Sequence, residues 1–349
     1  MKVGLHVNRK TSLTAFTLGY QKILQHNGIE CVLLNVEQPG FWRELSGVDA
    51  FIYQAGHASD VLQLSASFLP IIQQHSIIPT FPNFDTFWHF DDKLKQHYLA
   101  EFFQLPFAKS WVFWSKDSAL RWAGDAHYPL VFKLRGGAGS TNVILVKEPP
   151  MAKKLIKRAF SSGIADSTLP SSWRVKYLPL KKYIRNQLVM LYRALHKEDR
   201  TLYWQHSKNY AYFQSFLPGN EFDTRVSVIG QRAFAFRRFN RKEDFRASGS
   251  GKIDYARAAI DLDMVRIALE TSQKLGFQCM SYDFLYDDKI PVICEISYTF
   301  QDLAVYKCPG YWDANLEWHE GNYMPQLFIL NDLLNMELVQ PRDWFEKDG

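Results

Sequence analysis

The stretch YPLVFKLRGGAGSTNVILV, residues 128–146, predicts two short strands joined by a turn that is unusually rich in glycine. Residues 130–134 and 143–146 are mostly β-branched, aromatic or otherwise apolar, which is typical of paired strands. A hairpin needs only one glycine or an Asn-Gly pair to turn. The three glycines of this turn therefore indicate that something comes very close to its backbone.

The turn has the composition of an anion-binding loop. Successive exposed N–H groups form a concavity for an anion, and glycine lets the anion approach without a Cβ in the way. The lysine that precedes the turn would add a positive charge for the same anion. A surface turn without a ligand would have the same composition, so both interpretations stay open at this point. The residues concerned are Lys133, Gly136, Gly137, Gly139 and Ser140.

Three well-known phosphate-binding motifs are absent. The segment RASGSGKID is not a P-loop, because Arg246 stands where the first glycine belongs and Ile253 where a hydroxyl must hold magnesium. The segment GAGSTN is not a dinucleotide fingerprint, because Asn142 replaces the third glycine and a strand follows instead of a helix. No nucleophile elbow and no protein-kinase signature occurs.

A second hairpin, YDFLYDDKIPVICEIS, carries two acids among apolar residues. A turn near Asp288 sets Asp283 opposite Ile293 or Glu295, and in either register the two acids and Ser297 share one face of the pair. Burying carboxylates in apolar strands is costly without a cation or hydrogen bonds. Magnesium that bridges phosphate oxygens would be a suitable partner. An acid pair satisfied by Arg or Lys is the alternative.

Length and composition describe a globular protein with more than one core. The chain has 349 residues, enough for two or three cores. Its net charge of +5, from 41 basic and 36 acidic residues, does not indicate a nucleic-acid binder. No apolar run of about 18 residues and no signal-peptide core is present, so we expect no membrane span and a cytoplasmic protein. A homodimer is left open.

The order of apolar segments predicts an α/β protein. Strands alternate with helices over residues 1–86, which implies a parallel sheet with covered faces. Residues 87–212 contain the glycine-rich hairpin and, over residues 162–212, a basic insert. This insert is either an amphipathic helix with a solvated basic face or a dock for an acidic acceptor or membrane surface. Residues 213–340 return to a β pattern and contain the acidic hairpin.

Taken together, five segments resemble the ATP-grasp superfamily, in particular the branch with the ribosomal-protein glutamate ligase, glutathione synthetase and D-alanine–D-alanine ligase. The resemblance covers about residues 87–334, and the first 86 residues match the α/β domain that precedes the grasp. It implies an N-terminal parallel α/β domain followed by a two-subdomain ATP-grasp fold. The matching segments, in order, are DDKLKQHYLAEFFQLPFAKSW, YPLVFKLRGGAGSTNVILV, FQSFLPGNEFDTRVSVIG, FRRFNRKEDFRASGSG and YDFLYDDKIPVICEISYTF.

The resemblance implies ATP and two magnesium ions as cofactors and gives each site residue a role. Lys93 and Lys133 look like the phosphate lysines. The flexible lid over the phosphates would include Gly136, Gly137, Gly139 and Ser140. The segment QSFL resembles the hinge that reads adenine, and the residues of the adenosine site would be Gln214, Phe216, Leu217 and Glu221. The magnesium ligands would be Asp283, Glu295 and Ser297. The arginines of the acyl-phosphate and acceptor site would be Arg225, Arg238 and Arg246.

Two positions depart from the family pattern. Ser297 stands where the family usually has Asn in its metal strand, and Ser248 stands where the glutamate ligase has Asn. The implied activity is an ATP-dependent ligase that joins a carboxylate to an amine through an acyl phosphate. The acceptor could be an amino acid, a peptide or a glycan uronic acid. The alternatives are a phosphotransferase that acts on a hydroxyl and a non-catalytic nucleotide-binding scaffold.

Overall fold

The computed structural model of the chain describes residues 1–7, 13–137, 142–166, 205–241 and 251–341. Within it, the chain forms two compact units, and each is described by itself. Unit 1 comprises Met1–Ala55, Leu64–Phe90 and Glu221–Gly349, and unit 2 comprises Gly56–Gln63 and Asp91–Asn220. The three-part domain division predicted from the sequence stays a prediction. Most of the predicted basic insert, residues 167–204, lies outside the described residues.

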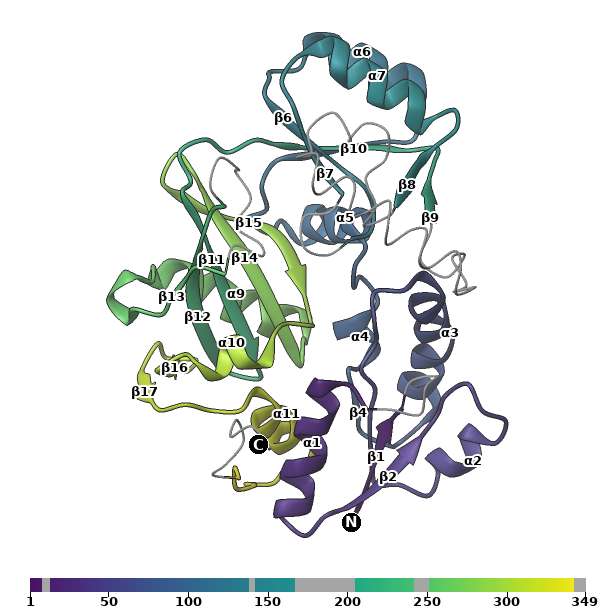
Figure 1. Cartoon of the computed structure of the whole chain (residues 1–349), viewed down its shortest axis with the longest axis vertical. Coiled ribbons are helices and arrows are strands. Elements are labelled where there is room, and N and C mark those ends of the chain that lie inside the picture. Colours follow the sequence, from purple (N-terminus) through teal and green to yellow (C-terminus); the bar gives the residue numbers. More distant parts are fainter. Residues whose placement is uncertain (8–12, 138–141, 167–204, 242–250, 342–349) are drawn as a thin grey trace, which may run out of the picture. The chain divides into compact units, whose positions relative to one another are not determined.

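Unit 1 begins with a parallel sheet in the order β2-β1-β3-β4, which confirms the predicted α/β pattern (Figure 1). Its strands are β1 (Lys2–His6), β2 (Glu30–Leu34), β3 (Ala50–Ile52) and β4 (Thr80–Phe81). The helices of this part of the chain are α1 (Ala15–His26), α2 (Phe41–Leu45), α3 (Ser59–His75) and α4 (Phe84–Phe87). Thr14 caps α1 by accepting a hydrogen bond from the Thr17 N–H. A threonine at this position satisfies one of the free N–H groups of the first turn.

Two segments far apart in the sequence, one near residue 27 and one near residue 339, lie together in unit 1. Helix α1 and the last helix, α11 (Pro325–Leu334), lie side by side (Figure 1). Just past α1, the Asn27 side chain donates to the Val339 carbonyl and accepts from the Val339 N–H, both at 2.8 Å. This reciprocal pair anchors the segment that follows α11 to the N-terminal part of the unit.

Unit 2 contains an antiparallel sheet in the order β5-β10-β6-β7. Its strands are β5 (Ser110–Phe113), β6 (Leu130–Lys133), β7 (Val143–Val146) and β10 (Ala211–Ser215). Helices α6 (Lys116–Asp125) and α7 (Pro149–Ala159) lie side by side and form a core with one face of the sheet (Figure 1). Helix α5 (Lys93–Phe103) packs Leu94 against Tyr210 and Tyr212. Strands β8 (Ile164–Asp166) and β9 (Gln205–Ser207) pair with each other.

The remainder of unit 1 is built on a larger sheet in the order β15-β14-β11-β12-β16-β17, with β13 paired to β12. Its strands are β11 (Phe222–Ile229), β12 (Arg232–Phe239), β13 (Ile253–Asp254), β14 (Cys279–Asp287), β15 (Ile290–Ser297), β16 (Gly310–Trp312) and β17 (Trp318–Glu320). The helices here are η3 (Arg257–Ala259), α9 (Leu262–Leu275) and α10 (Asp302–Tyr306). Helix α9 covers one face, where the Ser272 and Tyr282 hydroxyls lie 2.7 Å apart.

The acidic hairpin forms as predicted, but its register depends on a bulge. Asp288 and Lys289 both have positive φ, at 47° and 70°, and make a two-residue turn between β14 and β15. Continued without interruption, this turn would set Asp283 opposite Cys294. The register shifts between Asp283 and Phe284, and Asp283 faces Glu295 instead. A β-bulge is a common device for redirecting a side chain near a functional site.

No helix in the described parts of the chain is long and apolar enough to cross a bilayer.

Candidate nucleotide and metal sites

Lys133 lies at the end of β6, immediately before the glycine-rich turn. It pairs across the sheet with Tyr212, whereas the neighbouring Phe132 pairs with Phe213 in the core with α6 and α7. Because side chains alternate along a strand, Lys133 lies on the other face of the sheet, the face on which Tyr212 meets α5. Its side chain is buried, and Nζ donates to Gln214 Oε1 at 2.5 Å.

Lys93 is the first residue of α5, and it contacts the same turn. The Asp92 side chain caps this helix by accepting from the second and third N–H groups after it. The Lys93 N–H donates to the Arg135 carbonyl at 2.9 Å, and its Nζ donates to the Gly137 carbonyl at 3.1 Å. Lys93 is buried. Both predicted phosphate lysines are therefore held at the first half of one loop, Lys133 just before it and Lys93 through its hydrogen bonds to Arg135 and Gly137.

The backbone of the turn needs glycine at Gly137. This residue has φ of +115°, a conformation that side chains disfavour, and its N–H donates to Asp91 Oδ1 at 2.9 Å. A Cβ on Gly136 would lie 3.5 Å from the Asp91 carbonyl oxygen, which is an ordinary van der Waals contact. The Asn142 side chain closes the loop by donating to the Gly136 carbonyl at 2.9 Å. Two further predicted lid residues, Gly139 and Ser140, lie outside the described residues.

The predicted adenine hinge lies in and just after β10. Gln214 is buried and joins Lys133 to Ser110, since its Nε2 donates to the Ser110 hydroxyl at 3.1 Å. Leu217 is buried, and Phe216 is half-buried. The chain passes from unit 2 to unit 1 between Asn220 and Glu221. Glu221 is exposed, so the structure describes a carboxylate open to solvent at the position predicted for ribose.

Five charged side chains gather on one face of the large sheet in unit 1. Cross-strand partners place their side chains on the same face. Asp223 pairs with Arg238, Arg225 with Asp283, and Asp283 with Glu295. Asp223 and Arg225 are two residues apart on β11 and so share this face too. Four neighbouring strands thus contribute to one polar face, while α9 packs on the other.

The charges on this face form ion pairs of close geometry. Arg225 holds Asp283 through two hydrogen bonds, from Nε at 2.7 Å and from Nη2 at 2.8 Å. Arg238 holds Asp223 in the same bidentate way, at 2.7 and 2.6 Å. The Arg238 Nη2 also lies 2.9 Å from Asp283 Oδ2, so one guanidinium joins the two pairs. Arginine partners therefore satisfy Asp283, which is the alternative that the sequence left open.

The two aspartates differ in their acidity. Burial by itself would raise the pKa of the Asp283 carboxyl, but Arg225 and Arg238 outweigh burial and hold that pKa well below its usual range. Burial raises the pKa of Asp223, with Arg238 opposing the rise and the charge of Asp283 adding to it. Burial would lower the pKa of Arg238, but the two carboxylates raise it. The Asp283 carboxyl is therefore the stronger acid of the two, because it faces two guanidinium groups.

Asp283 and Glu295 offer the oxygen donors that magnesium takes. Magnesium usually binds one or two protein carboxylates and completes its shell with phosphates and water. The predicted third ligand, Ser297, donates its hydroxyl to the Thr299 carbonyl at 2.9 Å. In the described part of the chain, no group of three or more His, Cys, Asp or Glu side chains could hold a metal. The residue types suit a magnesium ion that two carboxylates and a bound phosphate would hold jointly, but in this structure arginines bind both oxygens of Asp283.

Two supporting residues were not singled out from the sequence. Asp91 binds the glycine loop, and the Tyr298 hydroxyl accepts from the Ala55 N–H at 3.1 Å. The second contact ties the residue after β15 to the segment that follows β3. The Asp-Asp-Lys run before α5 is a cap signal for Asp92, the neighbour of Asp91. Arg246, the third predicted arginine, lies outside the described residues.

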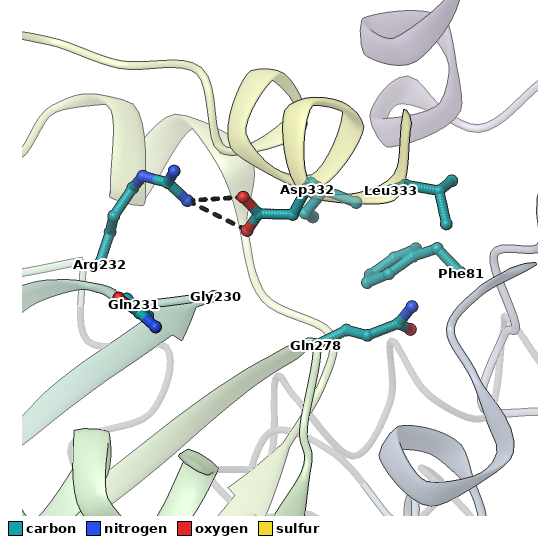
Figure 2. Close-up of a pocket in the computed structure, with 8 residues that line it drawn as sticks. Phe81, Gly230, Gln231, Arg232, Gln278, Asp332 and Leu333 are labelled. Carbon is teal, nitrogen blue, oxygen red and sulfur yellow. Dashed lines mark hydrogen bonds and ion pairs between the residues drawn. The ribbon is translucent and has the colours of Figure 1, made fainter. Parts of the chain in front are cut away.

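Unit 1 also contains a cavity of about 340 Å³, away from this charged face (Figure 2). It lies beside the turn between β11 and β12, where Arg232 donates to both oxygens of Asp332 at 3.0 Å. Gln278 is held on both sides, because it accepts from the Asn83 N–H and donates to the Thr80 carbonyl. Arg232 and Asp332 bind each other, and Gln278 binds the backbone of Asn83 and Thr80, so these contacts stabilise the packing of the unit.

No family model matches the sequence, and no curated protein matches it. Solved structures match its fold. A RimK domain ATP-grasp protein from Sphaerobacter thermophilus is 13% identical with a TM-score of 0.51, over 87% of this chain and 94% of that one. The RiPP-associated ATP-grasp ligase of Chryseobacterium gregarium, solved with ADP and a leader and core peptide, is 13% identical with a TM-score of 0.56 over 96% of each chain. The macrocyclase MdnC of Microcystis aeruginosa, bound to the precursor peptide MdnA, is 11% identical with a TM-score of 0.56, over 96% of this chain and 100% of that one.

These matches confirm the predicted fold: the chain has the ATP-grasp fold.

Proposed function

We propose that this chain is an ATP-dependent ligase that joins a carboxylate to an amine. A carboxylate oxygen of the substrate attacks the γ-phosphorus of ATP, the bond from that phosphorus to the β,γ-bridging oxygen breaks, and ADP leaves. The amine then attacks the carbonyl carbon of the acyl phosphate. The carbon–oxygen bond to phosphate breaks, and the amine nitrogen loses a proton to give the amide.

The observation that carries this proposal is the meeting of two buried lysines at one glycine loop. Phosphoryl transfer depends mainly on positioning and on neutralising negative charge, so it needs cations and N–H donors and no covalent nucleophile. We assign the ATP phosphates to Lys93, Lys133 and the loop from Gly136 onward, with Gly139 and Ser140 in its lid. The lid would exclude water, which hydrolyses acyl phosphates.

We assign magnesium to Asp283 and Glu295, with Ser297 as a third ligand and a second ion beside the first. When bound, the metal would neutralise charge on the transferred phosphoryl group. Arg225, Arg238 and Arg246 would hold oxygens of that group, since a guanidinium binds phosphate in a bidentate way. The adenosine would contact Gln214, Phe216, Leu217 and Glu221.

The substrate pair is proposed only as a class. A carboxylate and an amine from amino acids, peptides or glycan uronic acids fit the chemistry. Two of the structures with the same fold were solved with peptides bound. A screen should therefore include peptide carboxylates and peptide amines beside free amino acids, with ADP release as the measured signal.

The test is amine-dependent ADP release by purified variants. Lys133→Ala and Glu295→Gln should each lose at least about 100-fold in kcat/KM, because each removes a group that stabilises charge in the transition state. Lys153→Ala on α7 and Glu270→Gln on α9 are matched controls, since both side chains are exposed. Activity at the wild-type level in Lys133→Ala or Glu295→Gln, with folded protein, contradicts these assignments.

Hydroxylamine separates the ligase from a phosphotransferase. An acyl phosphate reacts with hydroxylamine to give a hydroxamate, whereas a phosphorylated hydroxyl does not. Hydroxamate that forms with ATP and the acid substrate, and that disappears in Lys133→Ala, is the expected result. ADP release without hydroxamate would point to the phosphotransferase instead.

A further inference from the structure

The carboxylate assigned to magnesium is already occupied by arginine in this structure. Arg225 grips Asp283 through both of its oxygens, at 2.7 and 2.8 Å, and Arg238 adds a third contact at 2.9 Å. The side chains of Arg225 and Asp283 are only 20% and 16% exposed, so water screens this pair weakly. A metal ion could take Asp283 only by displacing a guanidinium from it.

We propose that Arg225 is a latch that keeps divalent metal off Asp283 until a nucleotide is present. The inference rests on the proposed function and adds an order of events to it. A metal ion that binds Asp283 without nucleotide must break the bidentate ion pair between Arg225 and Asp283, and Arg225 is then left without an anionic partner. A triphosphate supplies new oxygens for the guanidinium, and only then does Asp283 become available to the metal. Metal and nucleotide would therefore bind together.

The two arginines differ in what they can do when Asp283 is taken. Arg238 keeps its bidentate bonds to Asp223, at 2.7 and 2.6 Å, whether or not it touches Asp283. For Arg225, the ion-pair partner in the described parts of the chain is Asp283. Arg225 is therefore the residue that must move to an incoming anion. Asp223 has the separate role of holding Arg238 in place.

The formal charges of the face agree with this order. Arg225 and Arg238 against Asp223, Asp283 and Glu295 leave one negative charge. A divalent ion alone would turn this into one positive charge in a poorly solvated place, which is unfavourable. Without Arg225 the remaining groups carry two negative charges, which a divalent ion neutralises. Removal of Arg225 should therefore create a metal site that needs no nucleotide.

The experiment titrates the nucleotide-free full-length protein with Mn²⁺ and follows the free ion by electron paramagnetic resonance. The wild type should bind Mn²⁺ weakly, and Arg225→Gln should bind it at least about tenfold more tightly, since a neighbouring charge shifts a carboxylate's ion affinity by about that factor or more. Adding Asp283→Asn to Arg225→Gln should abolish the gain. Equal Mn²⁺ affinity in the wild type and Arg225→Gln would overturn the latch.

Arg237→Gln is the matched control, because it removes one positive charge from β12, the strand that pairs with the β11 strand of Arg225. Arg237 is next to Arg238 in sequence and so points to the opposite face, where it pairs with Asp254. It should leave Mn²⁺ affinity unchanged, and an equal gain in Arg237→Gln would overturn the latch in favour of a general charge effect. If Arg225→Gln does not fold, Arg225→Lys serves, since it keeps the charge and loses the bidentate grip. A smaller gain is expected from it, and no gain in folded Arg225→Lys overturns the proposal.

A second titration separates this inference from the proposed function. With the β,γ-imido analogue of ATP present, the wild type should bind Mn²⁺ much more tightly than without it, and Arg225→Gln should show a smaller increase. If the analogue does not bind the wild type at all, the proposed function fails. If the analogue binds but Arg225→Gln gains nothing in its absence, only the latch fails.

Discussion

Replacing Arg225 by methionine should destabilise unit 1 far more than breaking an exposed ion pair of similar length. The change removes two hydrogen bonds, at 2.7 and 2.8 Å, and leaves a largely buried Asp283 with the single contact to Arg238. Removing one partner of a buried pair costs about 3–5 kcal/mol. We expect about 3 kcal/mol, near the lower end, because Arg238 remains.

The assay is thermal unfolding followed by circular dichroism. For a unit of about 200 residues, each kcal/mol shifts Tm by about 2–4 °C, so Arg225→Met should lower Tm by at least about 6 °C. The double variant Arg225→Met/Asp283→Asn should recover part of this loss, because no buried charge is left unpaired. The control pair, Arg266 and Asp263 on α9, is 2.5 Å long with side chains 51% and 59% exposed. Arg266→Met should cost about 0–1 kcal/mol.

The effect of Arg225→Met depends on pH with a definite sign. The pKa of Asp283 is lowered in the folded chain, so its contribution is complete above the pKa of an unfolded aspartate, about 3.9, and is lost as the pH falls below that value. The difference in Tm between the wild type and Arg225→Met should shrink in the same range. Equal losses from Arg225→Met and Arg266→Met, or no recovery in the double variant, would refute the reasoning.

Further predictions, at four other positions, also concern stability. Burial lowers the pKa of His6 from 6.5 to about 4. Between these two pH values the unfolded chain binds a proton that the folded chain does not, so the free energy of unfolding decreases as the pH is lowered. Between neutral pH and pH 5, the wild type should lose about 2 kcal/mol relative to His6→Asn, as measured by urea unfolding. Gly310→Ala should destabilise by about 1–3 kcal/mol, because a Cβ would clash with the backbone of β17, whereas Gly124→Ala in α6 should stabilise by about 0.5–1 kcal/mol. Tyr298→Phe leaves the Ala55 N–H without its partner and should cost about 1–3 kcal/mol, and an unchanged Tm would contradict this.

The sequence predicted those parts of the fold whose signals are local. The alternation of apolar strands with helices predicted the parallel N-terminal sheet. A glycine-rich turn between two apolar runs predicted the β6–β7 hairpin. Strands β16 and β17 were not predicted, because each has only three residues, too few to show an alternating pattern. In the structure they pair, with the Tyr311 and His319 rings stacked at 4.8 Å.

The site divides in the same way. Lys133 and the glycines are neighbours in sequence, so one segment was enough to find them, whereas Lys93 was predicted only through the family resemblance. The contact of Arg225 with Asp283 joins residues 58 positions apart and depends on the register between β11 and β14, which no local pattern reveals. That Asp283 and Glu295 share a face was predicted from their spacing, but their direct pairing and the bulge that produces it were not.

The central claim is that Lys133 and Glu295 act on one nucleotide, Lys133 through phosphate and Glu295 through the metal. Its most direct test is the affinity for the β,γ-imido analogue of ATP, measured by calorimetry with and without Mg²⁺. We expect Mg²⁺ to strengthen binding to the wild type, Lys133→Ala to weaken binding under both conditions, and Glu295→Gln to remove the magnesium effect while sparing metal-free binding. Affinities that match the wild type in both variants, with and without Mg²⁺, would contradict the claim.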